Sequence, residues 1–271
     1  MPDFASHDGA RIHFTDEGRG RPVLALSGLT RNGSDFDYLA PHLDDIRLIR
    51  MDYRRRGRSE WTGADTYTIP TEAGDVTALM DHLGLAALPI IGTSRGGLIS
   101  MVLAATAKER LEGVCLVDIG PEVPDAAMQN IRDYAGRDPA VGTFEDAAAL
   151  RAQLLPGFSG VSPERWMEEA RKHYVERDGC LAINYDPALG DAVRTPAPAV
   201  DLWPFFDALQ GMPVALIRGA NSDVLPREVA DRMRARNPNL IFTEVPDRGH
   251  VPFLDESEAL ACIRDWLGRL P

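Results

Sequence analysis

The chain has 271 residues, 44% of them hydrophobic, and a formal net charge of −12 at pH 7. This length suits one large core or a core with an insertion, and the acidic balance argues against nucleic acid and membrane surfaces as partners. No apolar run approaches the roughly 20 residues of a membrane-spanning helix, and the N-terminus lacks the basic and apolar stretches of a signal peptide. The three cysteines show no C-x-x-C spacing. We therefore expect a cytoplasmic protein with reduced thiols, either a monomer or a homodimer.

Strands and helices alternate along most of the chain. Alternating or continuous apolar runs predict strands at 11–14, 23–26, 47–51, 88–91, 113–119, 213–217 and 240–245. Helical periodicity predicts helices at about 34–43, 71–83, 98–107, 227–236 and 256–267. This alternation predicts a parallel sheet covered by helices on both faces, with ligands bound beyond the carboxyl ends of the strands.

The segment from residue 121 to residue 206 interrupts this alternation. It shows helical patterns at 125–134, 144–155 and 163–178 but no clear core strand. We interpret it as a helical cap, or lid, inserted into a core domain formed by residues 1–120 and 207–271. The alternative is that these helices simply pack on one face of the sheet.

The segment Gly92-Thr93-Ser94-Arg95-Gly96 is the strongest functional signal in the sequence. It lies between a predicted buried strand and a predicted helix, which is the context of a nucleophile elbow. Glycines on both sides of the serine allow a sharp turn that leaves the hydroxyl of Ser94 exposed above the sheet edge. The N-terminal amides of the following helix point to the same place, where they can stabilise a developing negative charge.

A serine nucleophile needs a base, and His250 is the best candidate among the six histidines. The other five lie in the N-terminal tail, in a predicted strand or on predicted helices. His250 follows the last predicted strand, and Gly249 before it allows the loop to turn the imidazole toward the other strand ends. Its ordinary pKa near 6.5 suits a base that works around neutral pH.

The acid that orients the imidazole should lie between the serine and the histidine in the chain. We predict Asp223, which follows the strand at 213–217. Asp118 and Glu122, which follow the preceding strand, are the competing candidates. Asp223 could instead cap the helix that begins near Arg227.

Two backbone amides should hold the oxyanion. One is the amide of Arg95, directly after the nucleophile, and the other is predicted to be that of Leu29, in the loop after the strand at 23–26. No metal-binding motif, P-loop or G-x-G-x-x-G spacing is present in the sequence. We therefore expect neither a cofactor nor a metal.

With these residues in place, the chain resembles the α/β-hydrolase superfamily. The resemblance rests on four motifs: Gly92-Thr93-Ser94-Arg95-Gly96-Gly97, Arg218-Gly219 with Asp223, Gly249-His250-Val251-Pro252, and Asp52-Tyr53-Arg54-Arg55-Arg56-Gly57-Arg58-Ser59. It implies a mostly parallel eight-stranded sheet flanked by helices, a helical cap after strand six, and hydrolysis without a cofactor. The sequence is similar to the small bacterial carboxylesterase, lactonase and C–C bond hydrolase branch.

Two positions depart from the family pattern. Ser27-Gly28 stands where the family usually has His-Gly after strand three, and Arg55 replaces the first glycine of its D-x-R-G-x-G-x-S loop. These departures put a histidine-dependent loop hydrogen bond in doubt and predict a reshaped loop at Arg55.

The predicted function is hydrolysis of a small ester or lactone through Ser94, His250 and Asp223. The alternatives are a C–C bond hydrolase of diketone or dienoate ring-cleavage products, and a ligand-binding protein on the same fold without catalysis. The side chain of Arg95 could bind a substrate carboxylate, or pair structurally with an acid such as Asp118 or Glu122. Trp166 and Trp203 could line an apolar pocket, or only pack the cap.

Overall fold

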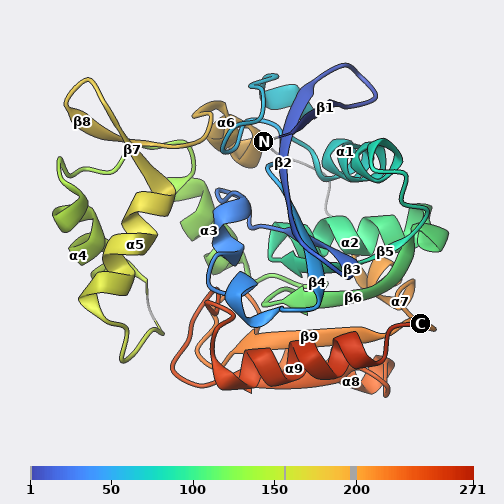
Figure 1. Ribbon diagram of the computed structural model, residues 1–271. Coiled ribbons are helices and arrows are strands. Elements are labelled where there is room, and N and C mark those ends of the chain that lie inside the picture. The colour runs from blue at the N-terminus through green and yellow to red at the C-terminus, as the bar shows by residue number, and fades with distance from the viewer. Residues whose placement is uncertain (1, 156, 196–199) are drawn as a thin grey trace.

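A computed structural model describes residues 2–155, 157–195 and 200–271 (Figure 1). Within these residues, eight strands join in one sheet in the order β1-β2-β4-β3-β5-β6-β9-β10. The pairs β1–β2 and β2–β4 are antiparallel, and every other neighbouring pair is parallel. The strands are β1 (Asp3–Ala5), β2 (Arg11–Gly18), β3 (Arg21–Leu26), β4 (Ile46–Met51), β5 (Leu88–Thr93), β6 (Leu111–Val117), β9 (Val214–Gly219) and β10 (Ile241–Val245). The predicted mostly parallel eight-stranded sheet is confirmed.

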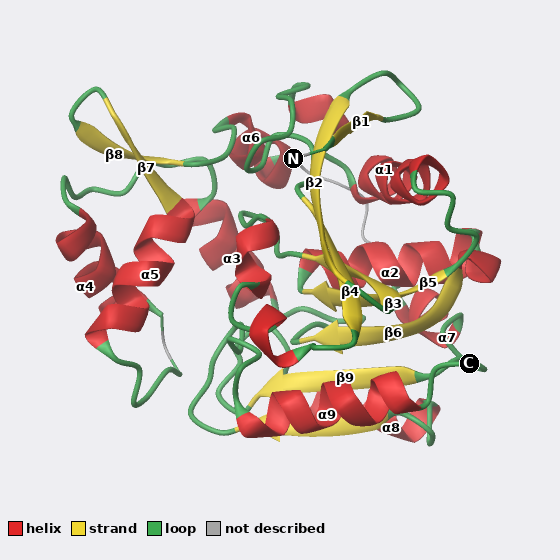
Figure 2. Cartoon of the chain, viewed as in Figure 1, coloured by secondary structure: helices red, strands yellow, loops and turns green. Residues whose placement is uncertain are grey.

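Helices cover both faces of this sheet (Figure 2). The helices packed around the sheet are α1 (Ile69–His82), α2 (Arg95–Thr106), α7 (Trp203–Asp207), α8 (Arg227–Arg236) and α9 (Ser257–Gly268). Short 3-10 helices are η1 (Gly33–Phe36), η2 (Ala40–His42), η3 (Ala64–Thr66) and η4 (Lys108–Arg110).

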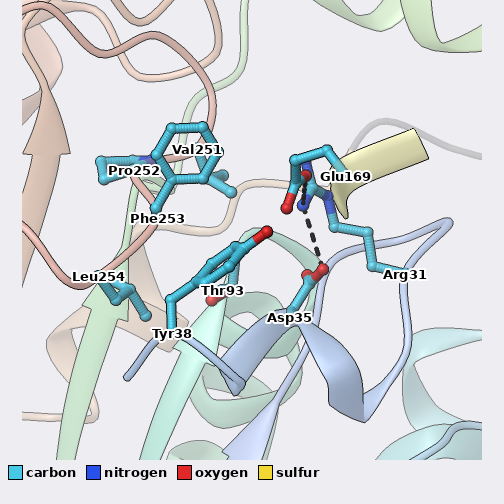
Figure 3. Close-up of a pocket in the computed structure, with 9 residues that line it drawn as sticks. All are labelled: Arg31, Asp35, Tyr38, Thr93, Glu169, Val251, Pro252, Phe253 and Leu254. Atoms are coloured by element: carbon cyan, nitrogen blue, oxygen red, sulfur yellow. Dashed lines mark hydrogen bonds and ion pairs between the residues drawn. The ribbon is translucent and has the colours of Figure 1, made fainter. Parts of the chain in front are cut away.

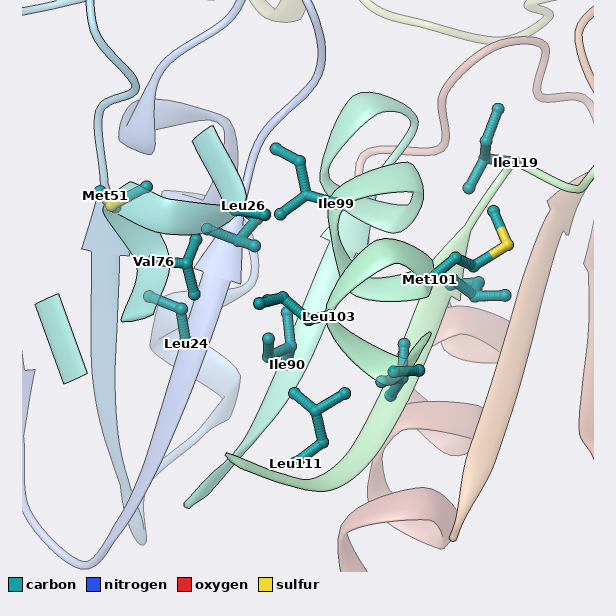
Figure 4. Packing of buried hydrophobic residues seen from close by; sticks show 14 of the residues in the cluster. Leu24, Leu26, Met51, Val76, Ile90, Ile99, Met101, Leu103, Leu111 and Ile119 are labelled. Atoms are coloured by element: carbon teal, nitrogen blue, oxygen red, sulfur yellow. The ribbon is translucent and has the colours of Figure 1, made fainter. Parts of the chain in front are cut away.

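The alternation of side chains along the strands divides the core into two layers. In the larger layer, Leu24 and Ile90 from the sheet pack with Val76 of α1 and with Ile99 and Leu103 of α2 (Figure 4). The opposite layer joins the other sheet face to α9 and η1 and includes the fully buried Trp266 and Phe36. Side chains on both faces of β5 are buried, which accounts for its continuous apolar sequence.

Helix α1 begins directly after its N-cap residue, Thr68. The side chain of Thr68 accepts a hydrogen bond from the backbone N–H of Thr71, and Pro70 occupies the first turn, where no intrahelical N–H partner is needed. This start places Glu72 in the first turn of α1, where it is fully buried.

The chain between β6 and α7 forms an insertion at the carboxyl ends of the parallel strands. The strand arrowheads point toward it in Figure 2. Its elements are α3 (Asp125–Tyr134), α4 (Phe144–Leu154), α5 (Pro163–His173), β7 (Tyr174–Arg177), β8 (Cys180–Ile183) and α6 (Ala188–Arg194). Trp166, Ala170 and Leu181 contribute to a small hydrophobic core of its own.

Two of the predicted helices differ in the structure. The helix expected at about 34–43 is replaced by the two short 3-10 helices η1 and η2. Pro41 lies inside the expected helix, where it lacks the N–H that a continuous helix needs.

The helix expected at 163–178 ends at His173 and is followed by the hairpin β7–β8. Asp178 and Gly179 connect these strands with φ values of 53° and 78°. Positive φ at both central residues is the geometry that the Asp-Gly pair favours in two-residue hairpins.

Candidate active site

Ser94 lies at a sharp turn between β5 and α2. Its backbone angles are φ 49° and ψ −109°, a strained conformation for a residue that has a Cβ. A Cβ on Gly92 would lie 2.6 Å from the carbonyl carbon of Gly96, and a Cβ on Gly96 would collide with the carbonyl oxygen of Leu26. Both glycines are therefore required for the turn, which leaves Ser94 half-buried at the carboxyl edge of the sheet.

His250 forms hydrogen bonds with both Ser94 and Asp118. Its Nε2 lies 3.0 Å from Oγ of Ser94, and its Nδ1 lies 2.8 Å from Oδ2 of Asp118. A carboxylate at Nδ1 favours the tautomer that has its proton there, which leaves Nε2 free to accept the serine proton. The three residues follow β5, β6 and β10, so distant parts of the chain form one hydroxyl–imidazole–carboxylate relay.

Asp118 has two further hydrogen bonds that fix its carboxylate. Its side chain is 0% exposed. Oδ1 accepts a hydrogen bond from the backbone N–H of Gly219 at 2.8 Å, and Oδ2 accepts one from the hydroxyl of Ser222 at 2.6 Å. These donors stabilise the buried negative charge and hold Oδ2 toward the imidazole.

The prediction of Asp223 as the acid is wrong, because Asp118 holds this position. The loop after β9 contributes a hydroxyl donor, Ser222, to the carboxylate of Asp118, and the next residue, Asp223, is exposed. The other competing candidate, Glu122, accepts hydrogen bonds from Arg232 and from Nε1 of Trp203 instead.

The two predicted oxyanion donors flank Ser94. Arg95 is the first residue of α2, so its N–H has no acceptor within the helix. A Cβ on Gly28 would lie 3.8 Å from Cβ of Ser94, which shows how closely the loop that carries Leu29 approaches Ser94. Among the described residues, neither the N–H of Leu29 nor that of Arg95 has a hydrogen-bond acceptor.

Two hydrogen bonds fix the backbone at the start of this loop, where Ser27 stands in place of the family histidine. The carbonyl oxygen of Ser27 accepts hydrogen bonds from Oη of Tyr53 at 3.1 Å and from the backbone N–H of Gly96 at 3.2 Å. These bonds join the end of β3 to the first turn of α2 and hold the Ser27–Gly28 turn beside Ser94.

The side chain of Arg95 forms a structural ion pair, but with neither of the predicted partners. Its Nε pairs with Oε2 of Glu72, and its Nη2 donates to the carbonyl oxygen of Tyr67 at 3.0 Å. The guanidinium therefore points toward α1, and Glu72 is a site residue that the sequence analysis missed.

Arg55 adopts the backbone conformation that glycine would have at its position. Its φ is 70°, in the left-handed region. The guanidinium is fully buried 3.9 Å from the ring centroid of Tyr67, and among the described residues none of its nitrogens has a hydrogen-bond partner. Burial and the neighbouring guanidinium of Arg56 lower the pKa of Arg55. The loop keeps the turn that glycine would form, so the predicted reshaping at Arg55 is wrong. The backbone of Arg55 is strained instead.

Arg55→Gly is expected to raise the free energy of unfolding by about 2 kcal/mol, since it removes backbone strain and an unpaired buried charge but loses one aromatic contact. Urea unfolding measures the change. Arg55→Ala is the matched control, because it removes the same charge but retains a Cβ at positive φ, and it should be about 1 kcal/mol less stable than the glycine variant. A glycine variant less stable than the natural protein would contradict this account.

A small pocket beside the relay joins the core to the insertion (Figure 3). Nη1 of Arg31 lies 3.1 Å from Oδ1 of Asp35 and 3.6 Å from Oε2 of Glu169 on α5. The residues that line the pocket are Arg31, Asp35, Tyr38, Thr93, Glu169, Val251, Pro252, Phe253 and Leu254. Thr93 precedes Ser94 and Val251 follows His250, so two of the lining residues are chain neighbours of the relay.

The two tryptophans considered for substrate binding lie outside this lining. Trp166 packs its ring against Phe158 and Phe253 at centroid distances of 5.6 and 6.3 Å, and only Phe253 reaches the pocket. Trp203 packs against Phe206 and donates to Glu122. Both tryptophans therefore have packing contacts, and within the described residues neither touches the relay.

Residues 2–155, 157–195 and 200–271 contain no group of three His, Cys, Asp or Glu side chains placed to hold a metal ion. None of the helices in these ranges is both long and apolar enough to cross a bilayer.

Comparison with known proteins shows the family of this chain. The model of the α/β-hydrolase fold family matches residues 21–257. A 3-hydroxybutyrate-oligomer hydrolase from Cupriavidus necator is 35% identical over 265 residues, which cover 93% of this chain and 90% of that protein. A putative carbamate hydrolase from a Caulobacter species is 27% identical over 88% of this chain and 87% of its own length.

A solved structure has nearly the same fold. The crystal structure of an α/β hydrolase from Novosphingobium aromaticivorans superposes with a TM-score of 0.93 at 34% identity, covering 99% of this chain and 98% of that one.

Proposed function

The chain belongs to the α/β-hydrolase fold family, and we propose that it is a serine hydrolase that cleaves a small ester through an acyl-enzyme intermediate. One observation carries the proposal. His250 lies within hydrogen-bond distance of both Ser94 and the buried carboxylate of Asp118. This arrangement gives the serine a base, and the base an orienting acid, without any group beyond the side chains of the chain.

The first step forms the acyl-enzyme. Oγ of Ser94 attacks the ester carbonyl carbon while Nε2 of His250 accepts the hydroxyl proton. The tetrahedral intermediate collapses when the carbon–oxygen bond to the alcohol breaks, and His250 gives its proton to the leaving alcohol. Asp118 stabilises the imidazolium that exists between these two proton transfers.

The second step releases the acid. A water molecule gives a proton to Nε2 of His250 and attacks the acyl carbon, and the bond to Ser94 breaks as the proton passes to Oγ. In both steps the negative charge on the carbonyl oxygen is held by the amides of Leu29 and Arg95. Such preorganised donors stabilise the transition state more than the substrate.

The insertion supports a role in substrate selection. We assign residues 121–206 as a cap and residues 1–120 and 207–271 as the catalytic core. Glu169 of α5 reaches Arg31 beside the relay, so the cap bounds the space where the substrate would bind. The similarity to a 3-hydroxybutyrate-oligomer hydrolase favours short esters of a small hydroxy acid.

A hydrolysis panel tests this proposal. It contains p-nitrophenyl acetate, butyrate and decanoate, the linear dimer of 3-hydroxybutyrate, an acyl lactone and a ring-cleavage diketone. We expect the highest kcat/KM for the short esters and the linear dimer. A diketone cleaved more than 100-fold faster than every ester would assign C–C bond hydrolysis instead. No turnover of any substrate would favour a ligand-binding protein.

A further inference from the structure

Glu72 is buried beside the candidate active site and forms ion pairs with two arginines. Its Oε1 lies 2.6 Å from Nη1 of Arg56, and its Oε2 pairs with Nε of Arg95. Glu72 and Arg56 are 0% exposed, and the side chain of Arg95 is 12% exposed. Each carboxylate oxygen therefore serves a different guanidinium, one on the loop after β4 and one on α2.

Each of these arginines is linked to one of the two amides of the candidate oxyanion hole. Nε of Arg56 donates a hydrogen bond to the carbonyl oxygen of Leu29, whose N–H is one of the two expected donors. Arg95 itself carries the other donor. A single buried carboxylate thus connects the two residues whose amides would hold the oxyanion, although they are far apart in the sequence.

Glu72 stays ionised, which strengthens its ion pairs with Arg56 and Arg95. Burial alone would raise the pKa of Glu72, but the guanidinium groups of Arg56 and Arg95 outweigh it and lower the pKa to about 2. The carboxylate is therefore charged at every pH at which a histidine base can work. Charge-assisted hydrogen bonds out of contact with water are short and directional, so they resist displacement of either partner.

We propose that Glu72 is a positioning residue that sets the spacing between the backbone amides of Leu29 and Arg95 for binding the oxyanion. The inference rests on the proposed serine hydrolase function. Glu72 touches neither the substrate nor the reacting atoms, and it acts through Arg56 and Arg95. A displacement of about 1 Å in such a constellation costs about 10²-fold in rate.

The chain contains a matched control on the same helix and the same loop. Asp75 of α1 is 0% exposed and pairs with Arg54, which is 1% exposed. Nε of Arg54 donates to Oδ2 of Asp75 at 2.7 Å. This pair joins α1 to the loop after β4 as Glu72 and Arg56 do, but it has no contact with Leu29 or Arg95 in the described part of the chain.

The experiment compares Glu72→Gln with Asp75→Asn. Active sites are counted by titration with a fluorophosphonate, and kcat and KM for p-nitrophenyl butyrate are expressed per active site. Inhibition by a trifluoromethyl ketone, which forms a tetrahedral oxyanion on the serine, reports the oxyanion hole separately. Thermal unfolding reports stability. Both variants are expected to be less stable than the natural protein, because each neutralises a buried carboxylate that pairs with a buried guanidinium. The loss should be smaller for Asp75→Asn, because Arg54 keeps its second partner, Asp8.

Only Glu72→Gln is expected to impair catalysis per active site. We expect kcat to fall about 10²-fold with KM within about twofold of the natural value, and the affinity for the trifluoromethyl ketone to fall by a similar factor to kcat. The pH dependence of kcat/KM should keep its shape, because His250 and Asp118 are unchanged. Asp75→Asn should keep kcat and ketone affinity within about twofold.

Equal effects of the two variants on kcat and ketone affinity would overturn the proposal and leave Glu72 with a role in stability alone. If Glu72→Gln does not fold, Arg95→Met provides the test. It removes the ion pair between Glu72 and Arg95 and leaves Glu72 paired with Arg56. A natural kcat in that variant would also overturn the proposal. Failure of the function itself is distinct, because the unmodified protein would then show no turnover and no fluorophosphonate titration.

Discussion

Ser94→Ala is expected to lower kcat for short esters by about 10⁶-fold, the loss found when a triad nucleophile is removed. The physical reason is that no other hydroxyl lies within reach of Nε2 of His250 among the described residues. Water would then have to attack the substrate directly, and only the oxyanion donors and binding contacts would remain. Steady-state hydrolysis of p-nitrophenyl butyrate measures the loss.

Ser100→Ala is the matched control for this substitution. Ser100 is a buried serine of α2, the helix that follows Ser94, and its hydroxyl donates to the carbonyl oxygen of Gly96 at 2.8 Å. It lies away from the imidazole, so its variant should keep kcat within about threefold. Substantial hydrolysis by Ser94→Ala with a natural KM would remove Ser94 from the mechanism.

Asp118→Asn is expected to lower kcat by about 10⁴-fold, because an amide can present its N–H to Nδ1 and favour the wrong imidazole tautomer. Nε2 would then carry the proton and could no longer accept one from Ser94. The loss should appear in kcat with little change in KM, and circular dichroism should show that the variant is folded.

Asp223→Asn serves as the comparison, since this residue also follows a strand end but is exposed and has no hydrogen bond with His250 in the described structure. It should keep nearly the natural activity. The reverse ranking, with Asp223→Asn severely impaired and Asp118→Asn active, would contradict the assigned acid.

Local patterns in the sequence predict the turn at Ser94 well. The turn at Ser94 needs small neighbours within two residues, and strand and helix signals on either side identify the junction. His250 could be selected by its position after the last strand. The parallel arrangement of the strands follows from the alternation of elements, because parallel neighbours need long crossover connections.

The choice between Asp118 and Asp223 depends on information that the sequence does not carry locally. Both follow buried strands that end at the same sheet edge, and both precede His250 in the chain. The backbone of Asp118 turns at φ 54° and buries its carboxylate, whereas the loop after β9 brings Ser222 inward and leaves Asp223 outside. Such loop geometry depends on tertiary contacts rather than on residue type.

Glu72 was equally hidden in the sequence. It lies in the first turn of a predicted helix, where an acidic residue is ordinary because it complements the helix dipole. Its importance becomes visible only when folding brings Arg56 and Arg95, from two other elements, to the two oxygens of one carboxylate.

Fluorophosphonate labelling followed by peptide mass spectrometry tests the central claim most directly. An activated serine attacks the phosphorus, fluoride leaves, and the adduct remains on the oxygen. The account predicts one adduct per chain, on the peptide that contains Ser94, and none in the His250→Ala variant under the same conditions. An ester-hydrolysing protein whose Ser94 stays unmodified, or whose adduct lies on another residue, would contradict it.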